Sequence, residues 1–433
     1  MKMKQSILSV IANQRKLGSV IYVDDTLSFR YAQSWLDWEK AFDLSVSMPL
    51  ASKTYDHSIV EPYLWGLLPD NSDILKQYGT QFHVSPRNVF RLLEHVGQDC
   101  PGAIQFITEE EEDDLLNVSY KEDVDWITKK QLDELILSIK ENKGLQRLSS
   151  SQGQFSLAGA QPKTALYQDR KSGRWGIPNG LTPTSHILKP AVGEFAGFAE
   201  NEHFCLRLAE AVGMDVAKSS VIMCADIPVI VVERYDRIFE NDILIRVHQE
   251  DMCQARSVYP ERKYENEGGP RVAHISETIW DFSDDAYADI TKFADALILN
   301  YLIIGTDAHA KNYSLLHLAS QRIRLTPLYD VVSALPYPNI YNPMKVKFAM
   351  KIGSEYLLRK IDKSHWEACA KQLKLKPSYV MERLKILAEN VMQKTDSVVQ
   401  KLNDEGLQHE IIETLSGMIN ERCESVLTQY LNE

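Results

Sequence analysis

The sequence has no long hydrophobic run, no closely spaced pair of cysteines and no excess of positive charge. No apolar segment approaches the roughly 20 residues of a membrane-spanning helix, and the start MKMKQSILSVIANQRK is too short and polar for a secretory signal. The six scattered cysteines argue against a zinc cluster or a disulfide framework and favour the reducing cytoplasm. The net charge of −12 argues against broad nucleic-acid binding, although a local basic patch or a basic partner protein is compatible with it.

The 433 residues are too many for one ordinary core and indicate two or three domains of a soluble globular protein. Near the N-terminus, VIYVDDTLSFRY predicts two strands around an Asp24-Asp25 turn. The segment SPRNVFRLLEHVG predicts a helix capped by Ser85 and ended by Gly97. The acidic run from Glu109 to Asp114 is typical of a solvated surface loop.

A change of pattern follows the helix predicted in TKKQLDELILSIKENKG, which should end at Gly144. From about Phe155 the segments KTALYQ, RWGIP, SHILKP and IPVIVVERYD read as short strands, and from Ile290 onward the chain reads as mainly helical. We therefore predict an α+β protein. Its expected parts are a small N-terminal α+β subdomain (1–110), an acidic linker and helix (111–150), a strand-rich lobe (151–240) and a helical lobe (241–433).

A cluster of polar residues interrupts the apolar segment LIIGTDAHAKNYSLL. Phe293, Leu297, Tyr301 and Ile304 precede it at helical spacing and predict a buried helix that leads to Asp307. Asp307 and Asn312 form the pattern D-x-x-x-x-N, the spacing of a base and a metal-binding amide in the catalytic loop of protein kinases.

Asp330 follows in LTPLYDVVSA, at the expected end of a short apolar strand. It could be a second magnesium ligand, while Lys311 could neutralise a phosphoryl group and His309 could support the loop or a phosphate oxygen. Turn and capping chemistry explains each of these residues when it is taken alone. Their order after a buried helix favours phosphoryl transfer.

Upstream segments supply the other parts that a kinase needs. FSLAGAQPKTALY offers small residues where backbone amides could approach phosphates, although a plain hairpin turn is the alternative. Lys189, at the end of a strand, could reach phosphates or simply be solvated. Glu202 could pair with Lys189 or be an acid of a first helical turn. The strand VIVVERYDR becomes polar at Glu233, where kinases bind the adenine edge.

Several motifs together resemble the HipA family of bacterial toxin serine/threonine kinases. They are SLAGAQPK, SHILKP, VERYDR, HQEDMCQA, TDAHAKNYSLL and LTPLYDVVSA, together with WGLLPDN and HVGQDCPGAIQF near the N-terminus. The resemblance covers nearly the whole chain. It implies a two-lobed, protein-kinase-like fold with an all-α C-terminal lobe.

The resemblance also implies a function. HipA-like kinases use ATP and Mg²⁺ to phosphorylate a serine of a translation component, typically an aminoacyl-tRNA synthetase, and so arrest growth and produce persistence. A HipB-like helix-turn-helix antitoxin neutralises them and connects them to DNA. The family pattern makes Asp307 the catalytic acid, Asn312 and Asp330 the magnesium ligands, and Ser156 the site of silencing autophosphorylation. It also implies nucleotide contacts from Leu157, Ala158, Gly159, Ala160, Gln161, Pro162, Lys189, Glu233 and Tyr235.

Two other functions are compatible with parts of the sequence. A degenerate kinase could serve only as a corepressor scaffold with an antitoxin on DNA, although the intact set of Lys189, Asp307, Asn312 and Asp330 argues against degeneration. A metal-dependent hydrolase could use Asp307, His309 and Asp330, but no dense cluster of histidines and acids supports it. In HQEDMCQA, the residues Glu250 and Asp251 predict a helix cap rather than a metal site.

Overall fold

The computed structural model describes residues 5–116, 122–141, 157–159, 161–191, 196–337, 342 and 344–431. The chain divides into two compact units, and each is built from segments that are distant in sequence. Unit 1 contains Met1–Pro190, Glu233–Glu261 and Ser314–Ile323, and unit 2 contains Ala191–Val232, Arg262–Tyr313 and Arg324–Glu433. Within the described ranges, no helix combines the length and the hydropathy needed to cross a bilayer.

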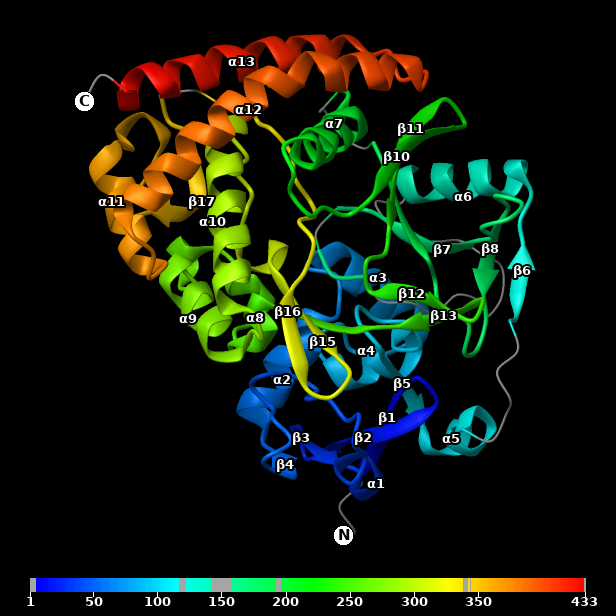
Figure 1. Ribbon diagram of the computed structural model, residues 1–433. Helices are drawn as coiled ribbons and strands as arrows, with labels where there is room; N and C mark the ends of the chain where they lie inside the picture. Colours follow the sequence, from blue (N-terminus) through cyan, green and yellow to red (C-terminus); the bar gives the residue numbers. More distant parts are fainter. Residues whose placement is uncertain are drawn as a thin grey trace. The chain divides into compact units, whose positions relative to one another are not determined.

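An antiparallel five-stranded sheet, in the order β4-β3-β2-β1-β5, organises the first part of unit 1 (Figure 1). Leu27, Phe29 and Tyr31 point into its core, and Asp24 and Asp25 form the turn with positive φ. The predicted hairpin is therefore confirmed. The elements of this part are β1 (Ser6–Ala12), β2 (Arg15–Val23), β3 (Thr26–Tyr31), α1 (Gln33–Leu36), β4 (Thr54–Tyr55), α2 (His57–Gly66), α3 (Ser72–Phe82), α4 (Val89–Val96) and β5 (Ile104–Thr108).

Two local predictions in this part are wrong. The side chain of Asn88, not Ser85, caps helix α4 by accepting a hydrogen bond from the Arg91 amide, while the helix ends at Gly97 as expected. The acidic run begins helix α5 (Glu109–Leu116) instead of forming a loop. Its glutamates fill the first turn, where the helix dipole favours negative charge, and Glu112 pairs with Lys16 at 2.6 Å.

The rest of unit 1 carries a second set of antiparallel strands, in the order β9-β7-β8-β6. The strands predicted in KTALYQ, RWGIP and SHILKP are confirmed as β7, β8 and β9, whereas Gly144 lies outside the described residues. The elements are β6 (Val124–Trp126), α6 (Lys129–Glu141), β7 (Thr164–Gln168), β8 (Trp175–Pro178), β9 (His186–Pro190), β12 (Arg237–Glu240), β13 (Ile243–Arg246), β14 (His248–Asp251), α8 (Met252–Ala255) and β15 (Ser314–Leu318).

The segment HQEDMCQA has a structural role. The Asp251 carboxylate accepts hydrogen bonds from the amides of Cys253 and Gln254, and Gln254 completes a capping box at the start of α8. Glu250 is fully buried and contacts Ser45, the Val46 amide and Nε2 of His317, the last at 2.8 Å. The predicted cap is confirmed. All six cysteines lie in described segments, and each is buried and forms no disulfide.

Unit 2 is mostly helical, and its long helices α12 and α13 lie side by side (Figure 1). Its elements are α7 (Phe198–Ala211), β10 (Ser219–Cys224), β11 (Ile227–Glu233, whose last residue belongs to unit 1), α9 (Val272–Phe282), α10 (Ala286–Ile303), β17 (Lys347–Ile352), β18 (Glu355–Leu357), α11 (Lys363–Gln372), α12 (Pro377–Asp404) and α13 (Glu410–Leu431). The strand predicted in IPVIVVERYD is confirmed as β11.

The all-α character implied for the C-terminal lobe (241–433) is wrong, although the chain from Ile290 onward is mainly helical as predicted. Strands β15, β16 (Arg322–Leu325), β17 and β18 separate α10 from α11. The buried helix before Asp307 is confirmed, because Phe293, Leu297 and Tyr301 are all buried along α10.

Candidate functional site

Helix α10 ends in a tight turn that leads to Asp307. Ile304 adopts a left-handed conformation with φ of 54°, and the Gly305 amide donates to the Asn300 carbonyl at 2.7 Å. A Cβ atom on Gly305 would lie only 2.1 Å from Oδ1 of Asn300, so the chain needs glycine for this close approach. The turn therefore fixes where the polar segment leaves the helix.

Asp307 and Asn312, the pair identified by spacing, are joined by a hydrogen bond. Nδ2 of Asn312 donates to the backbone carbonyl of Asp307 at 3.1 Å. The Asp307 carboxylate is exposed and accepts a 2.6 Å hydrogen bond from the hydroxyl of Tyr264 through Oδ1. Because the amide nitrogen of Asn312 is used by the loop, its oxygen is the atom suited to a metal ion.

His309 and Lys311 are both buried, at 5% and 6% exposure. The ring of His309 packs edge-on against Tyr264, with centroids 5.1 Å apart. The His309 amide donates to the Asp307 carbonyl at 2.8 Å. These contacts favour the loop-supporting role of His309 over a direct phosphate contact.

The backbone structure before Asp330 differs from the prediction. Strand β16 ends at Leu325, and the residues before Asp330 form only one isolated bridge, between Leu328 and Val216. Asp330 itself is exposed and left-handed, with φ of 58°. The expected strand end is therefore wrong, and a strained residue takes its place.

Hydrogen bonds on both sides hold the segment around Asp330. The Tyr329 hydroxyl donates to the carbonyl of Lys311 at 2.7 Å, which ties this segment to the D-x-x-x-x-N loop. The side chain of Asn201 accepts from the Ser333 amide at 3.0 Å and donates to the Ser333 carbonyl at 2.9 Å. Asn201 and Glu202 are both buried in α7, and Glu202 lies beyond its first turn.

The donor set around this segment fits magnesium. Among the described residues no group of three or more histidines, cysteines or acids could hold a metal ion. Magnesium does not need such a cage, because it usually takes one or two protein carboxylates and fills its shell with water and substrate phosphates. An exposed Asp330 carboxylate and an oriented Asn312 amide oxygen suit that chemistry.

Unit 1 contains the predicted nucleotide residues other than His309 and Lys311. Lys189 is buried in β9 at 7% exposure, so its solvated alternative is wrong. Gly159 has φ of 104°, and its carbonyl accepts a hydrogen bond from the Asp70 amide at 3.2 Å. Lys163 donates to the Ala158 carbonyl at 2.6 Å. Leu157, Gln161 and Pro162 are described, whereas Ser156 and Ala160 lie outside the described residues.

The segment 233–237, which begins with the last residue of β11 and contains the predicted adenine contacts Glu233 and Tyr235, is called the hinge. Glu233 is exposed and Tyr235 is half-buried, with its hydroxyl bonded to Oε1 of Gln249. Arg234 and Asp236 are buried, and the Arg234 amide donates to the Ser185 carbonyl at 2.9 Å. The predicted adenine contact of Glu233 therefore falls on an exposed side chain.

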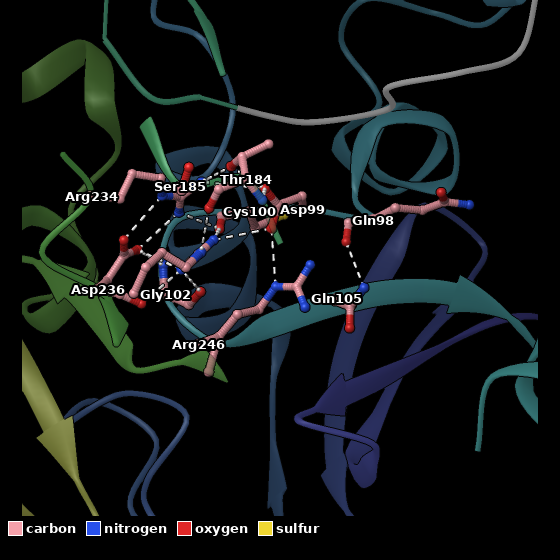
Figure 2. A network of polar contacts seen from close by, with 12 residues as sticks. Gln98, Asp99, Cys100, Gly102, Gln105, Thr184, Ser185, Arg234, Asp236 and Arg246 are labelled. Carbon is pink, nitrogen blue, oxygen red and sulfur yellow. Dashed lines mark hydrogen bonds and ion pairs between the residues drawn. The ribbon is translucent and has the colours of Figure 1, made fainter. Parts of the chain in front are cut away.

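Behind the hinge lies a buried ion network that the sequence reasoning missed. Figure 2 shows Asp99 and Asp236 among buried arginines. Burial opposes ionisation of Asp99, but the guanidinium groups of Arg237, Arg246 and Arg234 outweigh it and hold the pKa of Asp99 below its usual range. Burial likewise opposes ionisation of Asp236, yet Arg234 and Arg237 lower its pKa to about 2. The sequence shows that charged residues follow an apolar strand in VERYDR, but not that they are buried.

The predicted residues therefore fall into two sets. Asp307, Asn312, Asp330, His309 and Lys311 belong to unit 2, where hydrogen bonds link their segments. The described loop residues, Lys189, Glu233 and Tyr235 belong to unit 1.

Two family models match the chain. The HipA-like C-terminal domain matches residues 155–398, and the HipA N-terminal domain matches residues 8–107. The protein Y4mE of Sinorhizobium fredii is 35% identical over 384 residues, which cover 87% of this chain and 88% of that protein.

Two comparisons involve Shewanella oneidensis. Its serine/threonine-protein kinase toxin HipA is 27% identical over 345 residues, covering 77% of this chain and 75% of the toxin. The fold is similar to a structure of the Shewanella oneidensis MR-1 HipA, HipB and operator DNA complex, with a TM-score of 0.82, 23% identity and 98% coverage of both chains. The predicted kinase-like α+β fold of the HipA type is thus confirmed.

Proposed function

Because the chain belongs to the HipA family, we propose that it is a serine/threonine protein kinase that uses ATP and Mg²⁺. The observation that carries the proposal is the hydrogen bond from Asn312 to the Asp307 carbonyl, which joins the two residues of the D-x-x-x-x-N pattern. It supports a loop in which the exposed carboxylate of Asp307 accepts a proton and the oriented amide oxygen of Asn312 binds a metal ion.

In the proposed reaction the hydroxyl oxygen of a serine attacks the γ-phosphorus of ATP, and the bond to ADP breaks. Asp307 accepts the proton that the hydroxyl loses. Asn312 and Asp330 would hold magnesium, which neutralises the phosphate oxygens when bound. Lys189 and the backbone from Leu157 to Pro162 would contact phosphates, and the hinge at Glu233 and Tyr235 would bind adenine.

The family supports three further parts of the proposal. The substrate is a translation component of the cytoplasm, with an aminoacyl-tRNA synthetase as the first candidate, and its phosphorylation arrests growth. Autophosphorylation of Ser156 would silence the kinase, because a phosphate adds about two negative charges beside a loop that holds anions. A HipB-like antitoxin is the proposed partner, and the similar complex of HipA, HipB and operator DNA supports it.

Labelled ATP tests the proposal. Purified protein with ATP and Mg²⁺ should incorporate phosphate at Ser156, and Asp307→Asn should not. The matched control is Asp281→Asn, which changes an exposed acid on α9 and should label normally. Equal labelling of Asp307→Asn would remove Asp307 from its role. No labelling of any variant, together with normal antitoxin binding, would favour the corepressor scaffold.

A further inference from the structure

The loop between α4 and β5 is hydrogen-bonded to the segment at the end of β11 (Figure 2). Oδ1 of Asp99 accepts hydrogen bonds from Nη2 of Arg237 and Nε of Arg246, each at 3.0 Å. Its Oδ2 accepts from the hydroxyl of Thr184 at 2.5 Å and from Nη1 of Arg234 at 3.4 Å. We call the part of unit 1 from β1 to β5 the N-terminal region. One carboxylate of this region therefore contacts three arginines.

The backbone of the same loop also forms hydrogen bonds with the hinge. Arg234 donates to the Cys100 carbonyl at 2.9 Å, and Arg237 donates to the Gly102 carbonyl at 2.9 Å. In the reverse direction, the Gly102 amide donates to the Asp236 carboxylate at 2.7 Å. Loop and hinge segment are thus joined by backbone as well as side-chain groups.

Removing one charge from this network would cost much free energy. Its five ionised residues are three arginines and two aspartates, and none is more than 7% exposed. Nη2 of Arg246 makes no hydrogen bond, so the network already has one guanidinium that is incompletely paired. Removing a carboxylate would leave a buried positive charge without compensation, which is strongly unfavourable.

The network contains the buried residues of the hinge. Arg234, Asp236 and Arg237 point to the loop, whereas Glu233 is exposed and Tyr235 only half-buried. A second contact of the N-terminal region involves Gly159 of the predicted phosphate loop, whose carbonyl accepts from the Asp70 amide. The N-terminal region thus holds two segments assigned to ATP.

We propose that Asp99 is a positioning residue for nucleotide binding, which fixes the hinge backbone through Arg234 and Arg237 and makes the N-terminal region part of the ATP site. This inference rests on the proposed kinase function. It predicts that loss of Asp99 weakens ATP binding more than it slows phosphoryl transfer at saturating ATP.

The test is calorimetric titration of the full chain with ATP and Mg²⁺. Asp99→Asn should raise the Kd of ATP at least 10-fold, with kcat at saturating ATP within about 3-fold of wild type. The matched control is Asp289→Asn, which removes a fully buried carboxylate that pairs with Arg324 at 2.9 Å. It should lower the thermal midpoint without changing the Kd of ATP.

A double variant separates charge balance from general damage. Asp99→Asn with Arg246→Met restores the wild-type net charge of the network and should bring the Kd to within about 3-fold of wild type. If Asp99→Asn does not fold, Thr184→Val removes one neutral donor to Asp99 and should raise the Kd about 3-fold. Unchanged ATP affinity in the folded variants would overturn the inference, whereas failure of the wild type to bind ATP would overturn the proposed function itself.

Discussion

The hydroxyl of Tyr264 donates a 2.6 Å hydrogen bond to Oδ1 of Asp307, the proposed catalytic acid. Tyr264 also packs edge-on against His309, and the carbonyl of the neighbouring Lys263 accepts from the Ala310 amide at 3.3 Å. The tyrosine is therefore held by the loop that it contacts. Tyr264 therefore orients the carboxylate that is proposed to accept the proton of an incoming hydroxyl.

Tyr264→Phe should lower kcat about 10-fold and leave the KM for ATP unchanged, because the variant loses only the group that orients the carboxylate. Steady-state kinetics with varied ATP measure both parameters. Tyr287→Phe is the control, because Tyr287 is 57% exposed. A kcat equal to that of wild type would show that Tyr264 does not orient Asp307.

Local patterns predicted the part of the site that is local in sequence. Helix α10 and the pair Asp307 and Asn312 follow from apolar spacing and from a five-residue interval. The segment before Asp330 was predicted wrongly because apolar residues in LTPLYD suit a strand, whereas its conformation depends on contacts with Asn201 and Lys311 from distant parts of the chain.

The network around Asp99 shows a different limit. Nothing in HVGQDCPG or VERYDR alone shows that these charges are buried, because charged residues are normally exposed. Their burial depends on a pairing over more than 100 positions in sequence, between Asp99 and Arg234. Only a tertiary structure supplies such a pairing.

Asn201→Ala should loosen the segment that carries Asp330. The variant leaves the amide and carbonyl of Ser333 without their side-chain partner, which costs about 2 kcal/mol of unfolding free energy. The Mg²⁺ concentration for half-maximal activity should rise several-fold. Denaturant unfolding and a magnesium titration measure these effects. Asn420→Ala is the control, because Oδ1 of Asn420 makes no hydrogen bond, and a normal magnesium requirement in Asn201→Ala would contradict the argument.

Gly305→Ala should destabilise the turn before Asp307. The added Cβ would lie 2.1 Å from Oδ1 of Asn300, and relief of this overlap costs about 2 kcal/mol of unfolding free energy. The rate of phosphoryl transfer should fall as well, because the turn sets the position of Asp307.

Gly417→Ala is the control and should change stability in the opposite direction. It lies inside α13 with open space around its Cβ position, so alanine should stabilise by about 0.5–1 kcal/mol. Equal effects of the two substitutions would refute this reading.

The buried His248 should make stability depend on pH. Its Nε2 lies 2.8 Å from the Leu44 carbonyl and its Nδ1 lies 3.4 Å from the Ala103 amide, so the neutral ring donates to the first and accepts from the second. Burial, together with the neighbouring His317, lowers the pKa of His248 from 6.5 to about 3.

The sign of the effect follows from proton binding. Between pH 6.5 and about pH 3 the unfolded chain carries a proton on this residue and the folded protein does not. The free energy of unfolding should therefore fall as pH decreases below 6.5, by up to about 1.4 kcal/mol per pH unit for this group. Burial also lowers the pKa of His186 and of His203 to about 4, so both add to the same trend above that pH.

Denaturant unfolding at several pH values between 4.5 and 7.5 tests this expectation. His248→Gln should be less stable at pH 7.5 but should show a shallower decline at low pH, by about 1 kcal/mol per pH unit. His57→Gln is the control for the change of side chain itself, since His57 lies partly exposed at the start of α2. If His248→Gln kept the full slope, the loss of stability in acid would have to come from other groups, because a glutamine at this position cannot take up the proton.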